Sequence, residues 1–293
     1  SSALDQGQQL YSNAKEQNMS KVVFIDDFPD GTGGAEQVNR VVGDHFDVEW
    51  LKSDEITKLG ANDFYILGNI LLMHPGIIDA IVAENLNYVI LEHDYKICSS
   101  RHPWSYEGCI VPEEERINYD LYKNAKAVFV QTTDHLNVFK ANGVKANFIN
   151  LKSTLWSDED LDLLEVYWRK TEIEPRDWTC AVVNSSNWIK NTEGAIAFCK
   201  EARLDYTLIH PNDKRSVFIF NLSRHPSLVF FPLARESCCR LVVEARCLNM
   251  NVITSINYGA VLEPWYEMSG LELIEFLRKS TKKNLKKIKK YLP

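Results

Sequence analysis

The chain has 293 residues, of which 45% are hydrophobic and 25% are charged, and its formal net charge is −7. This composition is that of a globular protein, and the length favours two domains. No apolar run approaches the roughly 20 residues that span a bilayer, and the acidic balance argues against a whole-surface nucleic-acid binder. Seven cysteines without a regular spacing indicate reduced thiols and a cytoplasmic location.

Residues 1–18 are polar, and they show no basic segment followed by an apolar one, so no secretory signal is predicted. We interpret them as a polar leader that need not be ordered. From 19 to 152, strand and helix patterns alternate. Apolar, β-branched runs predict strands at 21–26, 46–51, 63–69, 88–94, 127–133 and 146–151, with helices at 35–46, 76–84, 113–124 and 134–142 between them. This alternation predicts a parallel sheet covered on both faces, in an N-terminal Rossmann-like domain.

The pattern changes at 153–175, where Ser157 and Asp160 resemble a capping box before an amphipathic helix that Pro175 ends. We interpret this stretch as a linker helix. A second alternation then fills 176–293. It predicts strands at 178–185, 205–210, 226–232 and 251–255, and helices at 192–203, 213–223, 238–248 and 270–291. The expected fold is α/β, with two Rossmann-like domains facing across a cleft, and ligands bind such sheets outside the carboxyl ends of the strands.

Glycines gather between the first strand and the first helix, in the stretch "DDFPDGTGGAEQVNR". Gly33 and Gly34 permit close backbone approach, and the helix that follows offers free N–H groups to an anion. The spacing matches neither a dinucleotide fingerprint nor a P-loop, so a simple tight turn is an equally good interpretation. Asp26 and Asp27 do not form an Asp-x-Asp metal motif, and we interpret Asp27 as part of the loop structure.

The stretch "FFPLARESCCRLVVEARCLNMNVITS", residues 230–255, places Glu236 just after a buried strand and Glu244 eight positions later. A helix that starts near Cys238 would put both carboxylates on one face, since eight residues are slightly over two turns. The free N–H groups from Ser237 to Arg240 would then point at a bound ligand. Taken alone, two glutamates at this spacing are common and equally typical of a solvated helix.

Two further places carry polar side chains at predicted strand ends. Lys190 follows the first strand of the second domain, where it can neutralise a phosphate, although a lone lysine is more often an ordinary surface residue.

His93 and Asp94 end the strand at 88–94 and face the cleft. We predict that both side chains contact a ligand bound in this cleft. A zinc site of His93, Cys98, His102 and Cys109 fits no standard spacing.

Together these stretches resemble the retaining, nucleotide-sugar-dependent glycosyltransferases of the GT-B fold, the group related to glycogen and sucrose synthases. "GTGGAE" resembles the family's glycine loop, and residues 230–255 resemble its pattern of strand, proline, paired glutamates and second strand. "NYGAVLE" resembles the glycine-containing segment that follows. The resemblance covers most of residues 19–265 and implies a metal-independent transferase that needs no cofactor beyond its nucleotide-sugar substrate.

The resemblance implies roles for three charged residues. Glu236 contacts the donor sugar, Glu244 holds the nucleotide ribose, and Lys190 binds the diphosphate. The arginine that usually precedes the lysine is absent, because Ser185, Ser186 and Asn187 occupy this region. Arg215 and Arg240 are candidates to replace it.

We therefore predict a glycosyltransferase with Glu236, His93 and Asp94 as catalytic residues and with residues 19–152 as the acceptor side. In this prediction His93 contacts the donor sugar or the acceptor, and Asp94 orients it or binds an acceptor hydroxyl. Gly33, Gly34, Lys190, Ser237, Cys238, Arg240 and Glu244 are the predicted donor-binding residues, with no metal ligand. The acceptor stays open among a glycan, a lipid-linked glycan, a protein and modified DNA. A nucleotide-sugar epimerase of the same fold is one alternative. A catalytically degenerate binding protein is another, which the missing arginine and the short chain favour.

The end of the chain is basic. Residues 278–290, from Arg278 to Lys290, carry eight lysines and arginines and no acidic residue. Leu285, Ile288 and Leu292 recur among them at helical spacing. Such a helix suits an anionic membrane surface or a phosphate backbone, and it equally suits a helix whose apolar stripe packs on the protein.

Overall fold

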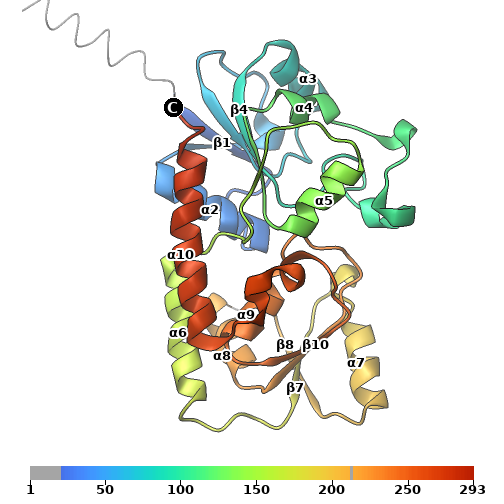
Figure 1. Cartoon of the computed structure of the whole chain (residues 1–293), viewed down its shortest axis with the longest axis vertical. Coiled ribbons are helices and arrows are strands. Elements are labelled where there is room, and N and C mark those ends of the chain that lie inside the picture. The colour runs from blue at the N-terminus through green and yellow to red at the C-terminus, as the bar shows by residue number, and fades with distance from the viewer. Residues whose placement is uncertain (1–20, 212–213) are drawn as a thin grey trace, which may run out of the picture.

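The computed structural model describes residues 21–211 and 214–293 and shows two parallel sheets, one above the other in Figure 1. The predicted leader, residues 1–18, lies outside the described residues. The first sheet has the strand order β2-β1-β3-β4-β5-β6 and the second the order β10-β9-β7-β8. All neighbouring strands are parallel. The predicted fold class, two Rossmann-like halves as in GT-B proteins, is confirmed.

The first sheet comprises β1 (Val22–Asp26), β2 (Glu49–Lys52), β3 (Phe64–Leu67), β4 (Asn87–Leu91), β5 (Val128–Val130) and β6 (Phe148–Asn150). Its helices are α2 (Gly34–Phe46), α3 (Pro75–Ala83), α4 (Tyr119–Asn124) and α5 (Thr133–Ala141). Every residue of β3 and β5 is buried. The continuous apolar runs of the sequence are therefore strands whose two faces are both covered, as a parallel sheet requires.

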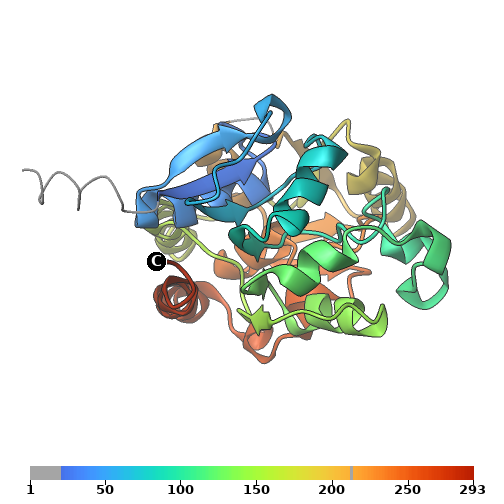
Figure 2. The same ribbon diagram turned by 90° about the horizontal axis from the view of Figure 1, so that it is seen from above.

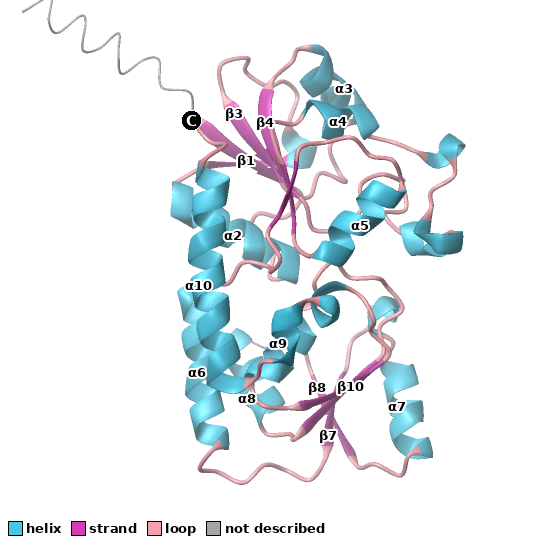
Figure 3. Ribbon diagram, viewed as in Figure 1, coloured by secondary structure: helices cyan, strands magenta, loops and turns pink. Residues whose placement is uncertain are grey.

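The second half begins with the long helix α6 (Asp158–Thr171), whose first turn is capped by the Ser157 side chain as the sequence predicts. The strands are β7 (Cys180–Val183), β8 (Tyr206–Ile209), β9 (Ser227–Phe230) and β10 (Asn251–Thr254). The helices are α7 (Thr192–Glu201), α8 (Arg215–Ser223), α9 (Arg240–Cys247) and α10 (Gly270–Lys289). Figure 3 shows how the helices surround both sheets and how α6 and α10 run side by side along one flank.

One predicted helix is much shorter than the sequence indicates. The expected helix at 113–124 begins only at Tyr119, and residues 113–115 form a separate 3-10 turn. Between them, Arg116 pairs with Cys98 as an isolated antiparallel bridge, and Asn118 takes a left-handed φ of 61°. A backbone that pairs across the loop cannot also make helical hydrogen bonds, so the tertiary contact overrides the local helical pattern.

Helix α10 joins the two halves (Figures 1 and 2). Near its start, Leu273 and Leu277 pack into the core around β7 and β9. Near its end, Leu285 and Ile288 pack with Phe24 in the core around β1 and β3. The apolar stripe of the basic helix is therefore covered by the protein itself. Within the described residues, no helix is long and apolar enough to cross a membrane.

We expect the end of α10 to stabilise the first half of the chain. Ile288 is 1% exposed, so Ile288→Ala leaves a cavity and lowers the free energy of unfolding by about 2–4 kcal/mol. The exposed neighbour Lys283→Ala is the control, with a change within about 0.5 kcal/mol. Urea denaturation measures both. Equal stabilities for the two variants would contradict this account of α10.

Candidate functional site

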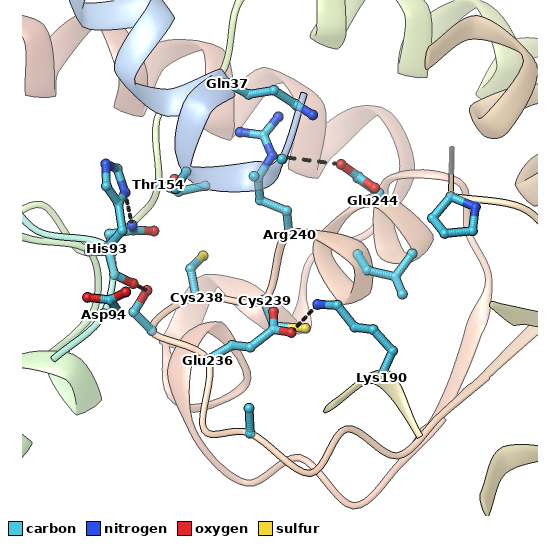
Figure 4. A pocket seen from close by; sticks show the side chains of 18 of the residues that line it. Gln37, His93, Asp94, Thr154, Lys190, Glu236, Cys238, Cys239, Arg240 and Glu244 are labelled. Carbon is cyan, nitrogen blue, oxygen red and sulfur yellow. Dashed lines mark hydrogen bonds and ion pairs between the residues drawn. The ribbon is translucent and has the colours of Figure 1, made fainter. Parts of the chain in front are cut away.

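A cavity of about 430 Å³ lies where the two halves meet. It is lined from the first half by the start of α2 and the loop after β4, and from the second half by the loops after β7 and β9 (Figure 4). In the second sheet β8 lies on one side of β7, and β9 and β10 lie on the other. The strand order therefore reverses at the boundary between β7 and β9. Ligands bind open α/β sheets at this switch point.

The loop after β7 delivers Lys190 to the cavity. A 3-10 turn, Trp188–Lys190, is capped by the Asn187 side chain and ends where Asn191 takes a left-handed backbone. The Lys190 ammonium lies 2.5 Å from a carboxylate oxygen of Glu236. Burial lowers the pKa of Lys190, but the Glu236 carboxylate outweighs it and raises the pKa above its usual value. The predicted lysine and the first predicted glutamate are thus an ion pair between two neighbouring strand ends.

The loop after β9 differs from the prediction in one respect. Helix α9 begins at Arg240 and not near Cys238, because Cys239 has a left-handed φ of 65°. Glu236 therefore precedes the helix, and the expectation that it shares a helix face with Glu244 is wrong. Both carboxylates still line the same cavity. Because Glu236 lies on a loop, its contact with Lys190 does not depend on the helical period.

Glu244, on α9, is 4% exposed and is held by arginines. The guanidinium of Arg215, at the start of α8, lies 2.7 Å from Glu244 and 2.8 Å from Asp160. Burial lowers the pKa of Arg215, and the two carboxylates more than compensate and raise it. Arg215 lines the cavity with Lys190. Asp160 was predicted only as a helix-capping residue, and its contact with two arginines depends on tertiary structure that the sequence pattern does not encode.

Arg240 also lines the cavity, and protein groups hold its guanidinium at three points. It donates to the Leu155 carbonyl at 2.8 Å and to Asp160 at 3.0 Å, and it lies 3.8 Å from the ring centre of Trp156. Burial lowers the pKa of Arg240. A side chain held at three points positions the start of α9, and its role toward a donor stays a prediction.

The glycine loop reaches the same cavity from the other side. Gly33 caps α2 with an extended backbone, and Gly33 and Gly34 both line the cavity. A Cβ at Gly34 would lie 3.3 Å from Cδ of Arg240, so the glycine lets the two halves approach closely. The starts of α2 and α9 both border the cavity, and both present free backbone N–H groups there.

Ser237 and Cys238 have structural contacts besides lining the cavity. The Ser237 hydroxyl donates to the His93 carbonyl at 2.6 Å, and its own carbonyl accepts from the Thr132 hydroxyl at 2.6 Å. Burial raises the pKa of the Cys238 thiol to about 12, so this thiol is protonated at neutral pH. Ser237 therefore fixes the loop of Glu236 against the first half of the chain.

His93 lines the cavity as a neutral imidazole. Its Nδ1 lies 2.9 Å from the amide nitrogen of Gln131, and its Nε2 lies 2.5 Å from the side-chain oxygen of Asn39. An amide nitrogen can only donate, so the proton of the ring lies on Nε2. Burial and then the charge of Lys96 lower the pKa of His93 well below its ordinary value. His93 therefore changes charge outside the physiological pH range.

Asp94 stands beside His93 at the cavity wall. Its backbone N–H and that of His93 both donate to the wholly buried Glu92, 3.1 Å away in each case. Burial raises the pKa of Asp94, while the nearby Lys96 ammonium lowers it by less. Glu92 itself accepts from Lys96 at 2.5 Å and from the Tyr122 hydroxyl. The sequence pattern does not indicate a role for Glu92, because a carboxylate near the end of a predicted strand is usually exposed to solvent.

Asp27 was interpreted as loop structure, and this is confirmed. Its carboxylate accepts from the backbone of Leu71 at 2.9 Å and of Leu72 at 3.1 Å, and from the Ser53 hydroxyl. Within residues 21–211 and 214–293, no three His, Cys, Asp or Glu side chains converge as a metal site. His93 has both nitrogens bonded to amides, which leaves neither for the alternative zinc site.

A set of polar contacts closes the seam beside the cavity. Asp134, at the start of α5, forms an ion pair with Arg235 and accepts from the backbone of Gly259 at 3.2 Å. Glu263 accepts from the backbone of Thr133 at 2.6 Å. These buried carboxylates hold the Glu236 loop and the residues after β10 against α5. The orientation of the two halves is therefore specified by hydrogen bonds at the site itself.

No protein-family model and no curated protein matches the chain. Solved structures do match its fold. Anabaena HepE, determined in complex with UDP and glucose, aligns over 90% of this chain and 89% of its own, with TM-score 0.53 and 14% identity. A UDP-forming α,α-trehalose-phosphate synthase from Burkholderia vietnamiensis aligns over 90% of this chain and 91% of its own, with TM-score 0.52 and 8% identity. The chain thus shares the GT-B fold of these transferases.

The buried histidines behind the cavity predict acid sensitivity. Burial lowers the pKa of His135 to about 4, against an ordinary value of 6.5. As the pH falls below 6.5 the unfolded state takes up this proton and the folded state does not, so stability is lost until the pH reaches about 4. Between pH 7 and pH 5 this histidine alone costs about 2 kcal/mol.

We expect His135→Gln to lose about 2 kcal/mol less stability than the wild type between pH 7 and pH 5. Urea unfolding at both pH values measures this difference. Circular dichroism at pH 7 confirms that the variant is folded. The same pH dependence in both proteins would show that His135 is not held neutral by burial.

Proposed function

We propose that the protein is a glycosyltransferase that moves a sugar from a nucleoside diphosphate donor to an acceptor hydroxyl, with retention at the anomeric carbon. The observation that carries the proposal is the ion pair of Lys190 and Glu236 at the switch point of the second sheet, in a cavity between two Rossmann-like halves. The likeness of residues 230–255 to the retaining family supports the stereochemistry. The HepE structure with UDP and glucose makes a UDP-sugar the first donor to test.

The cavity is suited to a diphosphate. Lys190, in the loop after β7, and Arg215, at the start of α8, place two positive charges at the cavity. The starts of α2 and α9 add their N-terminal dipoles. Each cation is paired with a glutamate in the free protein. Bound phosphates would take over part of these pairings and free the carboxylates for hydroxyl groups. In this scheme Glu236 accepts from the donor sugar, Glu244 accepts from the ribose, and Arg215 replaces the missing arginine.

The transfer exchanges one bond for another. The bond from the anomeric carbon to the diphosphate oxygen breaks, the acceptor oxygen bonds to that carbon, and the hydroxyl proton goes to the leaving diphosphate. Negative charge grows on the leaving group, so groups placed to stabilise it matter most. Lys190, Arg215 and the two helix starts are such groups. Asn39 and Gln131 engage both ring nitrogens of the neutral His93, so in this scheme it contacts the sugar through the face of its ring and adds no positive charge there.

Donor binding tests the proposal, through thermal unfolding against UDP-, GDP-, ADP-, CMP- and dTDP-sugars, with NAD as the control. A ligand that binds the folded state raises stability by about 2.7 kcal/mol at a hundred times its Kd. We expect one sugar nucleotide and its diphosphate to stabilise the protein. Lys190→Met should weaken both about ten- to hundred-fold, because a charged hydrogen bond contributes about 1.5–3 kcal/mol.

The matched control is Lys200→Met, an exposed lysine on α7. Lys190→Arg keeps the charge and should restore part of the affinity. Equal binding by Lys190→Met and the wild type would contradict the assignment of the diphosphate site. Binding without any sugar transfer would favour the degenerate protein, and conversion of the sugar nucleotide without an acceptor would identify an epimerase.

We also propose that α10 contacts an anionic membrane surface, as a peripheral site of a cytoplasmic enzyme. Its seven lysines from Lys279 to Lys290 form no ion pair within the described residues, whereas Arg278 is paired with Asp158 and Asp162. Burial and then the charge of Lys283 lower the pKa of Lys287, so neighbouring lysines of the helix repel one another. Lysine clusters on a helix are typical of contact with anionic lipids.

Vesicle sedimentation tests this contact, with phosphatidylglycerol–phosphatidylcholine vesicles against pure phosphatidylcholine. Replacing Lys282, Lys283, Lys286 and Lys290 by glutamine should weaken binding at least about a hundred-fold, since each lysine contributes about 1 kcal/mol. Glutamines at four exposed lysines of the first half are the control: Lys123, Lys126, Lys140 and Lys145. An equal loss of vesicle binding in both variants would show that binding follows the net charge of the protein, which would contradict a membrane site on α10.

A further inference from the structure

The segment 97–117, here called the lip, lies on the flank opposite α10 (Figures 1 and 2), and its Trp104 lines the cavity. It contains a 3-10 turn, Pro103–Ser105, that brings Trp104 to the cavity wall. Trp104 therefore lines the same space as Lys190 and Glu236 but comes from the other half of the chain. The sequence motifs that indicate donor binding do not account for it.

The indole of Trp104 is held in place by two rings. The His102 ring lies 4.4 Å away and tilted by 30°, and the ring of the buried Tyr95 lies 6.5 Å away in an edge contact. Tyr95 packs in turn against His135 at 4.9 Å. A large aromatic side chain that is fixed before binding loses little conformational entropy when a ligand stacks on it.

Asp94 offers a hydrogen-bond acceptor at the same wall. Its Oδ2 lies 2.9 Å from Arg101, and its buried Oδ1 lies 3.9 Å from the Lys96 ammonium. The backbone of Asp94 is fixed at both ends, by Glu92 and by the His135 ring, which lies 2.8 Å from the Asp94 carbonyl. The Asp94 side chain is 29% exposed and lines the cavity, and a carboxylate oxygen that is bonded to one arginine can still accept from a ligand hydroxyl.

The charge of the lip limits what can bind there. Residues 97–117 contain Glu107, Glu113, Glu114 and Glu115 but only two arginines. Both arginines are engaged, Arg101 by Asp94 and Arg116 by the Val111 carbonyl at 3.1 Å. These glutamates do not line the cavity themselves, but an acidic surface beside it disfavours an extended polyanion such as DNA. The lysines of α10 lie on the far flank and do not offset this charge at the lip.

We propose that Trp104 and Asp94 form an acceptor subsite for a neutral carbohydrate. The sugar ring stacks its C–H face on the indole, and one of its hydroxyls donates to the Asp94 carboxylate. This inference rests on the proposed glycosyl transfer, and it names the acceptor class that the sequence leaves open. An apolar face beside a row of hydroxyls is what distinguishes a sugar from the other acceptors.

Saturation-transfer NMR tests the subsite with the wild-type protein and UDP. The probes are the methyl glycosides of glucose, galactose, mannose and N-acetylglucosamine, with maltose and cellobiose. Glucose 6-phosphate and a DNA duplex are the charged competitors. We expect at least one neutral sugar to bind, with ring C–H protons receiving the transfer. Its Kd should rise at least ten-fold in Trp104→Ala and in Asp94→Asn.

The control is Trp178→Ala, which removes a tryptophan that is 96% exposed and lies outside the cavity. It should leave the Kd unchanged. Donor binding, measured by thermal shift, should survive in Trp104→Ala, which separates failure of the subsite from failure of the proposed transfer. The proposal is overturned if no neutral sugar binds, if sugar binding is insensitive to Trp104, or if the phosphate or the DNA binds this subsite instead.

Discussion

The hydrogen-bonded seam between α5 and the loop after β9 is the constraint on which the site depends. Asp134 and Arg235 pair across it, and Ser237 is bonded both to His93 and to Thr132. Glu236 lies between Arg235 and Ser237 in the sequence, so it is positioned by contacts that belong to the opposite half of the chain. The geometry of the cavity around Glu236 therefore depends on the arrangement of the two halves. Helix α10 supports the same arrangement from the other flank by packing into both cores.

The charged groups of the cavity are arranged in pairs. Lys190 is paired with Glu236, Arg215 with Glu244, and Arg240 with Asp160. Pairing in this way lowers the free energy of placing these cations in the cavity, because each one has a carboxylate partner. In the proposed function, an incoming diphosphate would replace the two carboxylates as the partner of Lys190 and Arg215. The binding of phosphate would then be coupled to the release of Glu236 and Glu244 toward hydroxyl groups.

The fold and the placement of several site residues follow from the sequence. Continuous apolar runs that alternate with helical periods specify parallel sheets, and polar residues just past those runs necessarily gather at the carboxyl edges. Lys190, Glu236 and His93 are found in this way. The sequence predicts that α9 starts near Cys238, whereas it starts at Arg240. The sequence pattern does not indicate the left-handed backbone of Cys239, a conformation that non-glycine residues seldom adopt.

Other parts of the site are set by contacts between distant residues and escape any local pattern. Arg215 reaches Glu244 from another helix, and Asp160 reaches two arginines from the start of α6. Glu92 lies inside a run that reads as a strand end, and only the folded chain shows that Lys96 and Tyr122 satisfy it. Trp104 reaches the cavity from a loop in which the sequence predicts neither strand nor helix. Its role depends on the rings of His102 and Tyr95 behind it.

The most direct measurement is the analysis of products. The protein is incubated with the sugar nucleotide that stabilises it most and with the neutral sugar that binds it best. Released nucleoside diphosphate and the anomeric coupling of the new linkage are then followed by NMR. The account predicts diphosphate release that requires the acceptor, a product with the anomeric configuration of the donor, and loss of both in Glu236→Ala. Inverted configuration, or release that is unchanged without an acceptor or in Glu236→Ala, would contradict it.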